Sequence, residues 1–269
     1  MSISKIICFF FFTLFSCCFV NGQQIGKKIK EIKSAEVICA TVDRLGNFFI
    51  VSKNNVIKKF DAQGKLMATL KGKNTTLLEP WYHPSIFLYS HVNQKYWIYG
   101  RYFENGKEYL LEPSWAIQPT LVCPSNDNKL WLFDAADASI KKVNPITKEV
   151  VIEFYTDTLK AKVPPVYTHL REYQNMIFLL DQQSGISVYS HIGKRIYQID
   201  KKGINNFNFF GEELYYLDGT KMKFFDLGTG TTREIEVGVE YKYVLASDES
   251  IILVNQKNRI LMFESKQIE

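Results

Sequence analysis

The side chains that support catalysis or metal binding in proteins are scattered along this chain. Its four histidines form no His-x-His or His-x-x-x-His pair and have no paired cysteines beside them, so they predict no local metal site. They are His83, His91, His169 and His191. The chain also lacks a Gly-x-Ser-x-Gly nucleophile elbow, a phosphate-binding glycine loop and a dinucleotide fingerprint. We therefore predict a protein that is not an enzyme and that requires no metal and no cofactor.

Two groups of acidic residues resemble functional sites. Asp43, Asp127 and Glu213 could supply the paired carboxylates of a glycoside-cleaving enzyme if the fold brought them together. Asp134 and Asp137 are separated by two alanines, but the segment lacks the alternating oxygen ligands, central glycine and terminal glutamate of a calcium loop. We expect an ordinary turn at this segment, because short polar side chains bond the backbone amides of turns.

Aromatic side chains are concentrated between Trp81 and Trp115. They can fill the faces of packed strands, or they can form a contact surface, since Trp, Tyr and Arg dominate binding hot spots. Strand alternation along WIYGRYF would place Trp97, Tyr99 and Arg101 on one face. We expect Trp97 and Tyr99 to lie in the core. The predicted partner-binding surface consists of Tyr82, His83, Arg101, Tyr102 and Trp115.

Short strands in a repeating unit would position these residues. A strand that ends in a polar residue, a tight turn and a second strand recur at intervals of about 40 residues, which is the period of β-propeller blades. The pattern is clearest from Val37 onward, where four strand segments separated by turns make one blade: VICATVD, FFIVS, VIKKFD and KLMATL. No segment shows sustained helical periodicity.

Six such units predict an all-β fold, a six-bladed β-propeller with mostly four antiparallel strands per blade. The second-strand positions used to count the blades are Phe49, Trp97, Trp131, Phe178, Tyr215 and Ile252. Their unequal spacing predicts insertions at residues 72–85 and 155–167. The last unit has only three strands of its own, and we expect the segment IKEIKSA, from Ile29, to supply the fourth and close the ring. A five-bladed ring or an open arc is the alternative.

At the level of the repeat, the chain resembles six-bladed propellers of the NHL and TolB-like kind, particularly secreted ones of Bacteroidota. The similar residues are Asp43-Arg44-Leu45-Gly46-Asn47 before FFIV, and Ile57-Lys58-Lys59-Phe60-Asp61 followed by Gly64-Lys65. They cover one blade well and the others loosely. The resemblance implies the fold and a binding or scaffolding role, and it names no catalytic residue. In that phylum, type IX secretion and outer-membrane assembly machines include soluble accessory proteins on the periplasmic side.

Residues 1–22 have the features of a secretory signal peptide, with Lys5, an apolar run from Ile6 to Val20 and then small and polar residues. The run is shorter than the ~20 residues of a membrane-spanning helix. We predict cleavage after Gly22, which leaves one propeller domain over residues 23–269, exported to the periplasm and without a transmembrane segment. The alternative is a lipoprotein anchored through Cys17.

Charge and cysteine content restrict the function further. The formal net charge of +5 at pH 7 is small and the basic residues are scattered, so the chain is not expected to bind nucleic acid. Outside the predicted signal peptide only Cys39 and Cys123 remain. Both fall on the first strands of different blades, so we expect buried free thiols and no disulfide.

These features predict a non-catalytic periplasmic scaffold that binds a protein partner, in an outer-membrane export (type IX secretion) or assembly complex. The alternative is a carbohydrate-binding or carbohydrate-active propeller that uses the mouth of its central channel. Aromatic rings open to the channel, with two acids about 5 to 9.5 Å apart, would favour the glycan ligand; a flat patch would favour the protein partner.

Overall fold

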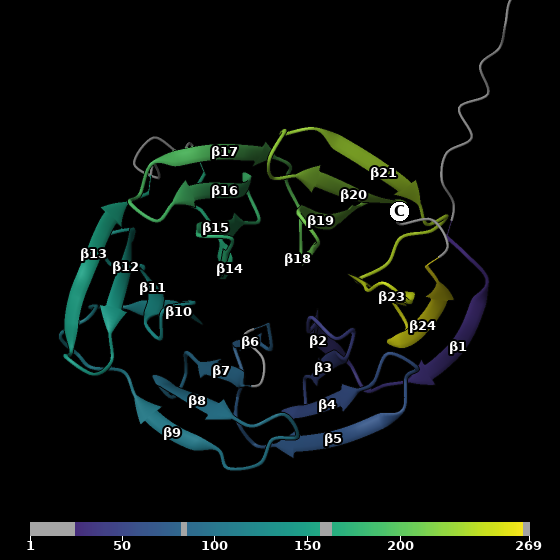
Figure 1. Ribbon diagram of the computed structural model, residues 1–269, viewed down its shortest axis with the longest axis horizontal. Helices are drawn as coiled ribbons and strands as arrows, with labels where there is room; N and C mark the ends of the chain where they lie inside the picture. Colours follow the sequence, from purple (N-terminus) through teal and green to yellow (C-terminus); the bar gives the residue numbers. More distant parts are fainter. Residues whose placement is uncertain (1–24, 82–84, 157–162, 266–269) are drawn as a thin grey trace, which may run out of the picture.

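In the computed structural model, residues 25–81, 85–156 and 163–265 are described, and they form six four-stranded antiparallel sheets arranged in a ring (Figure 1). Blade one contains β2 (Val37–Val42), β3 (Phe48–Ser52), β4 (Val56–Phe60) and β5 (Leu66–Lys71). Blade two contains β6 (Leu77–Glu79), β7 (Ile86–Ser90), β8 (Lys95–Tyr99) and β9 (Lys107–Leu110). Blade three contains β10 (Pro119–Pro124), β11 (Leu130–Asp134), β12 (Ser139–Asn144) and β13 (Glu149–Tyr155).

The remaining blades have the same order, with the first strand nearest the centre. Blade four contains β14 (Tyr167–Tyr173), β15 (Met176–Asp181), β16 (Gly185–Ser190) and β17 (Arg195–Asp200). Blade five contains β18 (Phe207–Phe210), β19 (Glu213–Asp218), β20 (Lys221–Asp226) and β21 (Thr232–Glu236). Blade six contains β22 (Tyr243–Ala246), β23 (Ser250–Val254), β24 (Arg259–Glu264) and β1 (Lys28–Lys33). The predicted six-bladed propeller is therefore confirmed.

Ring closure depends on the first strand of the chain. β1 pairs antiparallel with β24, so the two ends of the described chain share blade six, where the purple β1 lies beside the yellow β24 in Figure 1. This pairing covers an edge that β24 would otherwise expose. The prediction that the segment from Ile29 closes the ring is confirmed, and the five-bladed and open-arc alternatives are wrong.

Burial follows the position of a strand within its blade. Second strands such as β3 and β11 are buried along their whole length, because neighbouring blades pack on both of their faces. Fourth strands such as β5 and β13 are half-buried or exposed throughout, because they form the outer rim. Apolar clusters fill the spaces between neighbouring blades, which explains why no blade is a separate folding unit. No described residues form a helix long and apolar enough to cross a bilayer.

Blade two corrects two details of the sequence prediction. Trp97 lies on β8, the third strand, whereas the other residues used for counting lie on second strands. The proposed insertion at residues 72–85 contains β6, the first strand of the blade, in only three residues. Because this strand is so short, its sequence pattern was mistaken for a loop. The second proposed insertion lies partly outside the described residues, at 157–162.

Both remaining cysteines lie on first strands of their blades, Cys39 on β2 and Cys123 on β10, and both are free, as predicted. Cys123 is buried and Cys39 is half-buried. Desolvation raises the pKa of Cys39 to about 12 and raises that of Cys123 well above its ordinary value. Thiols in this state are poor nucleophiles, so neither cysteine is a candidate for catalysis.

The antiparallel order of each blade defines two faces of the ring. Turns that join first to second strands and third to fourth strands leave the blade at the same end. We call this side the mouth face, because the first-to-second turns surround the channel. Turns that join second to third strands, such as the one at Val92, lie on the opposite face.

Candidate functional site

A buried ion pair crosses the central channel. Arg171 on β14 forms two hydrogen bonds with the carboxylate of Glu79 on β6, Nε to Oε2 at 2.5 Å and Nη2 to Oε1 at 3.1 Å. The same guanidinium donates from Nη1 to Asn208 Oδ1 on β18 at 2.9 Å, and Thr41 Oγ1 on β2 lies 3.2 Å from that oxygen. Bidentate pairing is the strongest geometry available to arginine and carboxylate. One network thus links blades one, two, four and five.

The Arg171–Glu79 pair supports a cluster of aromatic rings above it. Glu79 Oε1 accepts a hydrogen bond from the backbone nitrogen of Trp81 at 3.0 Å, and the Arg171 guanidinium lies 4.9 Å from the centre of the Phe209 ring. Tyr173 stacks on Phe209 at 4.1 Å, and Trp81 contacts Tyr173 edge to face at 5.4 Å. The channel network therefore helps to fix the positions of the Trp81, Tyr173 and Phe209 rings at the mouth face.

These rings form part of a hollow of about 480 Å³, which we call the mouth hollow. Its walls come from the first-to-second turns of blades one, five and six, and include Arg44, Asp248 and Glu249. The Arg44 guanidinium lies 5.2 Å above the centre of the Trp81 ring, within range of a cation–π interaction. The volume lies within the range of about 300–1,000 Å³ that is usual for ligand pockets.

Lys59 connects the mouth hollow to blade two. Its side chain is only 2% exposed, and its Nζ lies 3.8 Å from the carboxylate of Asp43 and donates to the carbonyl of Arg101 at 3.0 Å. The ammonium also lies 5.3 Å from the centre of the Tyr102 ring. Desolvation lowers the pKa of Lys59, and Asp43 opposes that shift. A single buried cation thus holds the blade-two turn against the turn that lines the hollow.

Beside this contact lies a shallow groove of about 610 Å³, which we call the blade-two groove. It is formed by the turn between β8 and β9 and by neighbouring strand residues, and its lining includes Ile98, Arg101, Tyr102, Lys107 and Tyr109. Tyr102 is 49% exposed and Arg101 is half-buried. Both predicted partner residues are therefore accessible on the mouth face.

The other predicted partner residues have different positions. Trp115 is only 3% exposed, and its indole nitrogen donates to the carbonyl of Lys148 at 3.1 Å, so it belongs to the core between blades two and three and forms no surface. Tyr82 and His83 lie outside the described residues. Trp97 and Tyr99 are buried, as expected. β8 ends at Tyr99, so Arg101 lies in a turn and shares no strand face with these rings.

The three acids considered for glycoside cleavage are not brought together. Asp43, in blade one, is buried, and its carboxylate accepts the backbone amides of Leu45 and Asn47 in its own turn at 3.0 and 2.9 Å. Asp127, in blade three, bonds Lys129 and Ser125, and Glu213, in blade five, is paired with Arg233. Each carboxylate is used within its own blade, which leaves no acid pair among these residues.

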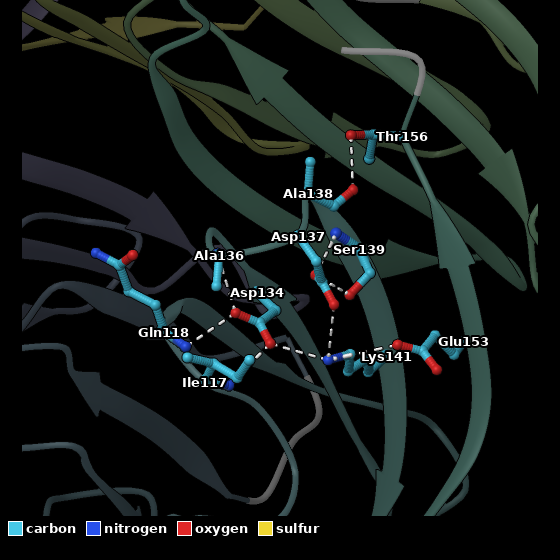
Figure 2. A network of polar contacts seen from close by, with 10 residues as sticks. All are labelled: Ile117, Gln118, Asp134, Ala136, Asp137, Ala138, Ser139, Lys141, Glu153 and Thr156. Carbon is cyan, nitrogen blue, oxygen red and sulfur yellow. Dashed lines mark hydrogen bonds and ion pairs between the residues drawn. The ribbon is translucent and has the colours of Figure 1, made fainter. Parts of the chain in front are cut away.

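Asp134 shows why polar residues recur at the ends of second strands. Figure 2 shows its buried carboxylate accepting the backbone amides of Ile117 and Gln118, both at 2.9 Å, and the ammonium of Lys141 at 2.9 Å. Burial alone would raise the pKa of Asp134, but the bonds from Lys141 and the backbone lower it to about 2. The segment from Asp134 to Asp137 is therefore a structural turn, as predicted, and its first carboxylate already has a full set of donors.

Histidine ligands are also absent from the part of the chain that the structure describes, where no group of three or more His, Cys, Asp and Glu side chains could hold a metal ion. His91 is hydrogen-bonded to the carbonyl of Pro119 at 3.0 Å. His169 lies on the innermost strand β14, beside a channel cavity of about 20 Å³. Desolvation, together with the charge of Arg171, lowers the pKa of His169 to about 4, so it is neutral at pH 7.

Sequence reasoning missed the charged residues that organise this site. Arg171 and Glu79 are separated by 92 positions, so no local pattern joins them. Lys59 and Arg44 were noted only as parts of a strand and a turn. The available signal was a charged residue within a first or third strand, where burial requires a partner, but the strand sequence does not identify that partner.

Comparison with known proteins supports the fold. No protein-family model and no curated protein sequence matches the chain. Among solved structures, the chain is similar to the β-propeller domain of Myceliophteria thermophila Cps50 (Swd1), with 11% identity, a TM-score of 0.64 and coverage of 90% of this chain and 100% of that one. The WD40 domain of Neurospora crassa Pan2 is 9% identical, with a TM-score of 0.62 and coverage of 92% and 97%.

A third similar structure is an enzyme. Virginiamycin B lyase from Staphylococcus aureus is 12% identical, with a TM-score of 0.58 and coverage of 87% of this chain and 98% of that chain. At these identities the likeness shows the fold alone. The fold is a β-propeller. The resemblance to the NHL and TolB-like kind stays a prediction, because these matches are to other propellers.

Substitution of Asp134 by Asn tests the structural role of the blade-three turn. Asp134→Asn should lower the free energy of unfolding at pH 7 by about 3 kcal/mol, because buried donors lose their charged acceptor. The pKa of Asp134 in the folded protein is below its ordinary value of 3.8, so its contribution is present above that pH and is lost as pH falls toward 2. Urea unfolding followed by circular dichroism at pH 7 and near pH 2 should show the difference between the two proteins shrink.

The control for this experiment is Asp137→Asn. Asp137 also bonds Lys141 but is more exposed, so its loss should cost less than about 1 kcal/mol. Equal losses for the two variants, or a difference that does not change with pH, would contradict the role assigned to Asp134.

Substitution of Arg171 tests the channel ion pair. Arg171→Met should lower the free energy of unfolding by about 3 kcal/mol, because it leaves the Glu79 carboxylate buried without its partner. The double variant Glu79→Gln with Arg171→Met removes the orphaned charge and retains an acceptor for the Trp81 amide. It should therefore be more stable than Arg171→Met alone by about 2 kcal/mol, as measured by urea unfolding. Equal free energies of unfolding for the single and the double variant would contradict the role assigned to the Arg171–Glu79 ion pair.

Proposed function

We propose that this protein is a non-catalytic scaffold that binds a protein partner through its mouth face. The observation that supports this most directly is the Lys59 contact, which joins Asp43 in the lining of the mouth hollow to Arg101 in the lining of the blade-two groove. Arg101 and Tyr102 line the blade-two groove, and arginine and tyrosine often dominate the binding energy of protein interfaces. A preformed surface loses little conformational entropy on association.

The charged residues near this surface favour binding over catalysis. Asp43, Asp127 and Glu213 serve local turns and ion pairs, and the cysteine thiols have raised pKa values. Two of the similar solved structures are a WD40 domain and a propeller domain named without an enzymatic activity, which agrees with a scaffold, while the lyase shows that the fold can also support an enzyme.

The location of the partner rests on sequence. The apolar segment within residues 1–22 supports export, so the proposal places the protein in the periplasm. A role in an outer-membrane export complex of the type IX secretion kind, or in an assembly complex, rests on the resemblance to propellers of Bacteroidota. The glycan alternative has less support, because Trp81, Tyr173 and Phe209 at the mouth are buried and offer no open ring face for a sugar.

Alanine at both Arg101 and Tyr102 tests the proposed surface. The double variant should reduce recovery of the partner at least about tenfold, since two hot-spot side chains are removed. The melting temperature should change by no more than about 2 °C, because neither side chain is fully buried. Tagged protein would be purified from detergent-solubilised envelope, and bound proteins would be quantified by mass spectrometry against an untagged control.

The matched control is Val92→Ala with Asn93→Ala. Both residues lie in the exposed turn between β7 and β8, in the same blade but on the opposite face, and Val92 is 77% exposed. Partner recovery should be unchanged in this variant. Equal recovery with all three proteins would refute the surface, and a large loss of stability in the first variant would show that Arg101 and Tyr102 act in the core.

A further inference from the structure

Trp81 has an unused hydrogen-bond donor at the mouth hollow. Its side chain lines the hollow and is only 9% exposed, yet its indole Nε1–H has no hydrogen-bond partner in the described part of the chain. Leaving a buried donor unpaired costs about 1–3 kcal/mol. The backbone amide of Trp81 is bonded to Glu79, so the residue that carries this unpaired donor is fixed at the edge of the hollow.

Another part of the lining is acidic. Asp248 and Glu249 are exposed in the turn between β22 and β23, and Asp248 has no side-chain partner among the described residues. The Glu249 carboxylate accepts one hydrogen bond from Gln63 at 2.7 Å. The only cation lining the hollow in the described residues is Arg44, which lies over Trp81 and forms no ion pair with these acids. The lining of the hollow thus combines an unpaired indole donor with an excess of negative charge.

An occupant must match both the unpaired donor and the acidic residues. A neutral apolar group would leave the indole donor unpaired, and a simple anion would face the two carboxylates. A peptide backbone offers carbonyl oxygens for the Trp81 and Arg44 donors, and a lysine or arginine side chain on the same segment offers the cation that Asp248 and Glu249 favour. A hollow of about 480 Å³ accommodates a short peptide segment.

We propose that the mouth hollow binds a peptide segment that contains a lysine or arginine. A carbonyl of the segment accepts the Trp81 Nε1–H, and its basic side chain lies against Asp248 and Glu249. This inference rests on the proposed function, because it names the segment of a protein partner that the mouth face recognises. It adds a second contact point, at the mouth hollow, to the one in blade two.

The test begins with random peptides displayed on phage and selected on the full chain. Selected peptides should be enriched in lysine or arginine, and the strongest would be synthesised and its Kd measured by isothermal titration calorimetry. Asp248→Asn with Glu249→Gln should weaken its binding about five- to tenfold. Trp81→Phe, which keeps a ring beneath Arg44 but removes the donor, should weaken it about three- to tenfold.

The control variant is Glu149→Gln with Asp200→Asn, which removes two exposed carboxylates from the outer rim. Its affinity for the peptide should equal that of the native protein. Selection of no peptides, selection without basic residues, or equal affinity in the mouth variants would overturn the inference. If Trp81→Phe does not fold, the variant Asp248→Asn with Glu249→Gln still tests the inference.

Capture of the cellular partner separates this inference from the proposed function. If the blade-two variant loses the partner and the acidic-pair variant keeps it, the proposed function stands and the mouth site is refuted. If the blade-two variant keeps the partner while the mouth variants lose the peptide, the mouth site stands and the blade-two surface is refuted.

Discussion

The Arg171–Glu79 ion pair in the channel is the interaction on which the mouth of this propeller depends. It joins the first strands of blades two and four, which are not neighbours in the ring, and anchors the Trp81 backbone, and the guanidinium also contacts the Phe209 ring. Buried ion pairs add little net stability compared with apolar packing, because desolvation opposes the attraction. Here the pair instead sets the positions of the groups above it, since moving either residue would leave a buried charge without its partner.

Lys59 is a second buried charge that fixes the positions of mouth-face groups, farther from the channel. Its ammonium contacts the Asp43 carboxylate at the hollow and the Arg101 carbonyl in blade two, so two turns from neighbouring blades are held in one arrangement. Outer strands such as β5 and β13 are solvated along most of their length. Buried charges thus restrict motion at this part of the mouth face, and restricted surfaces bind with a smaller entropic cost.

The sequence predicted the fold well, because each blade repeats the same local pattern of apolar strands and polar turns. Phe49 and Trp131 lie at equivalent buried positions on second strands, as the period requires. The prediction was wrong in blade two, where β6 has only three residues and Trp97 lies on the third strand, β8, and not on the second. A strand of that length has too few residues to show alternation.

The site was less predictable, for a physical reason. Exposure of an aromatic residue depends on which blade packs against it, so Tyr102 and Trp115 could not be distinguished by type, although one is exposed and the other is in the core. The charges that organise the channel come from first strands of different blades, and their pairing depends on ring closure. Local sequence identifies turn residues such as Asp134, whose partners are near in the chain, better than it identifies Arg171.

Photo-crosslinking in intact cells tests most directly whether the mouth face is the surface that binds a partner. A photoreactive phenylalanine analogue would replace Leu45 or Tyr102 on the mouth face, and Val92 or Gln256 on the opposite face, all exposed positions. The proposed function predicts one protein adduct of the same mass from both mouth-face positions and none from the other two. Adducts from the opposite face alone, or from all four positions equally, would contradict it.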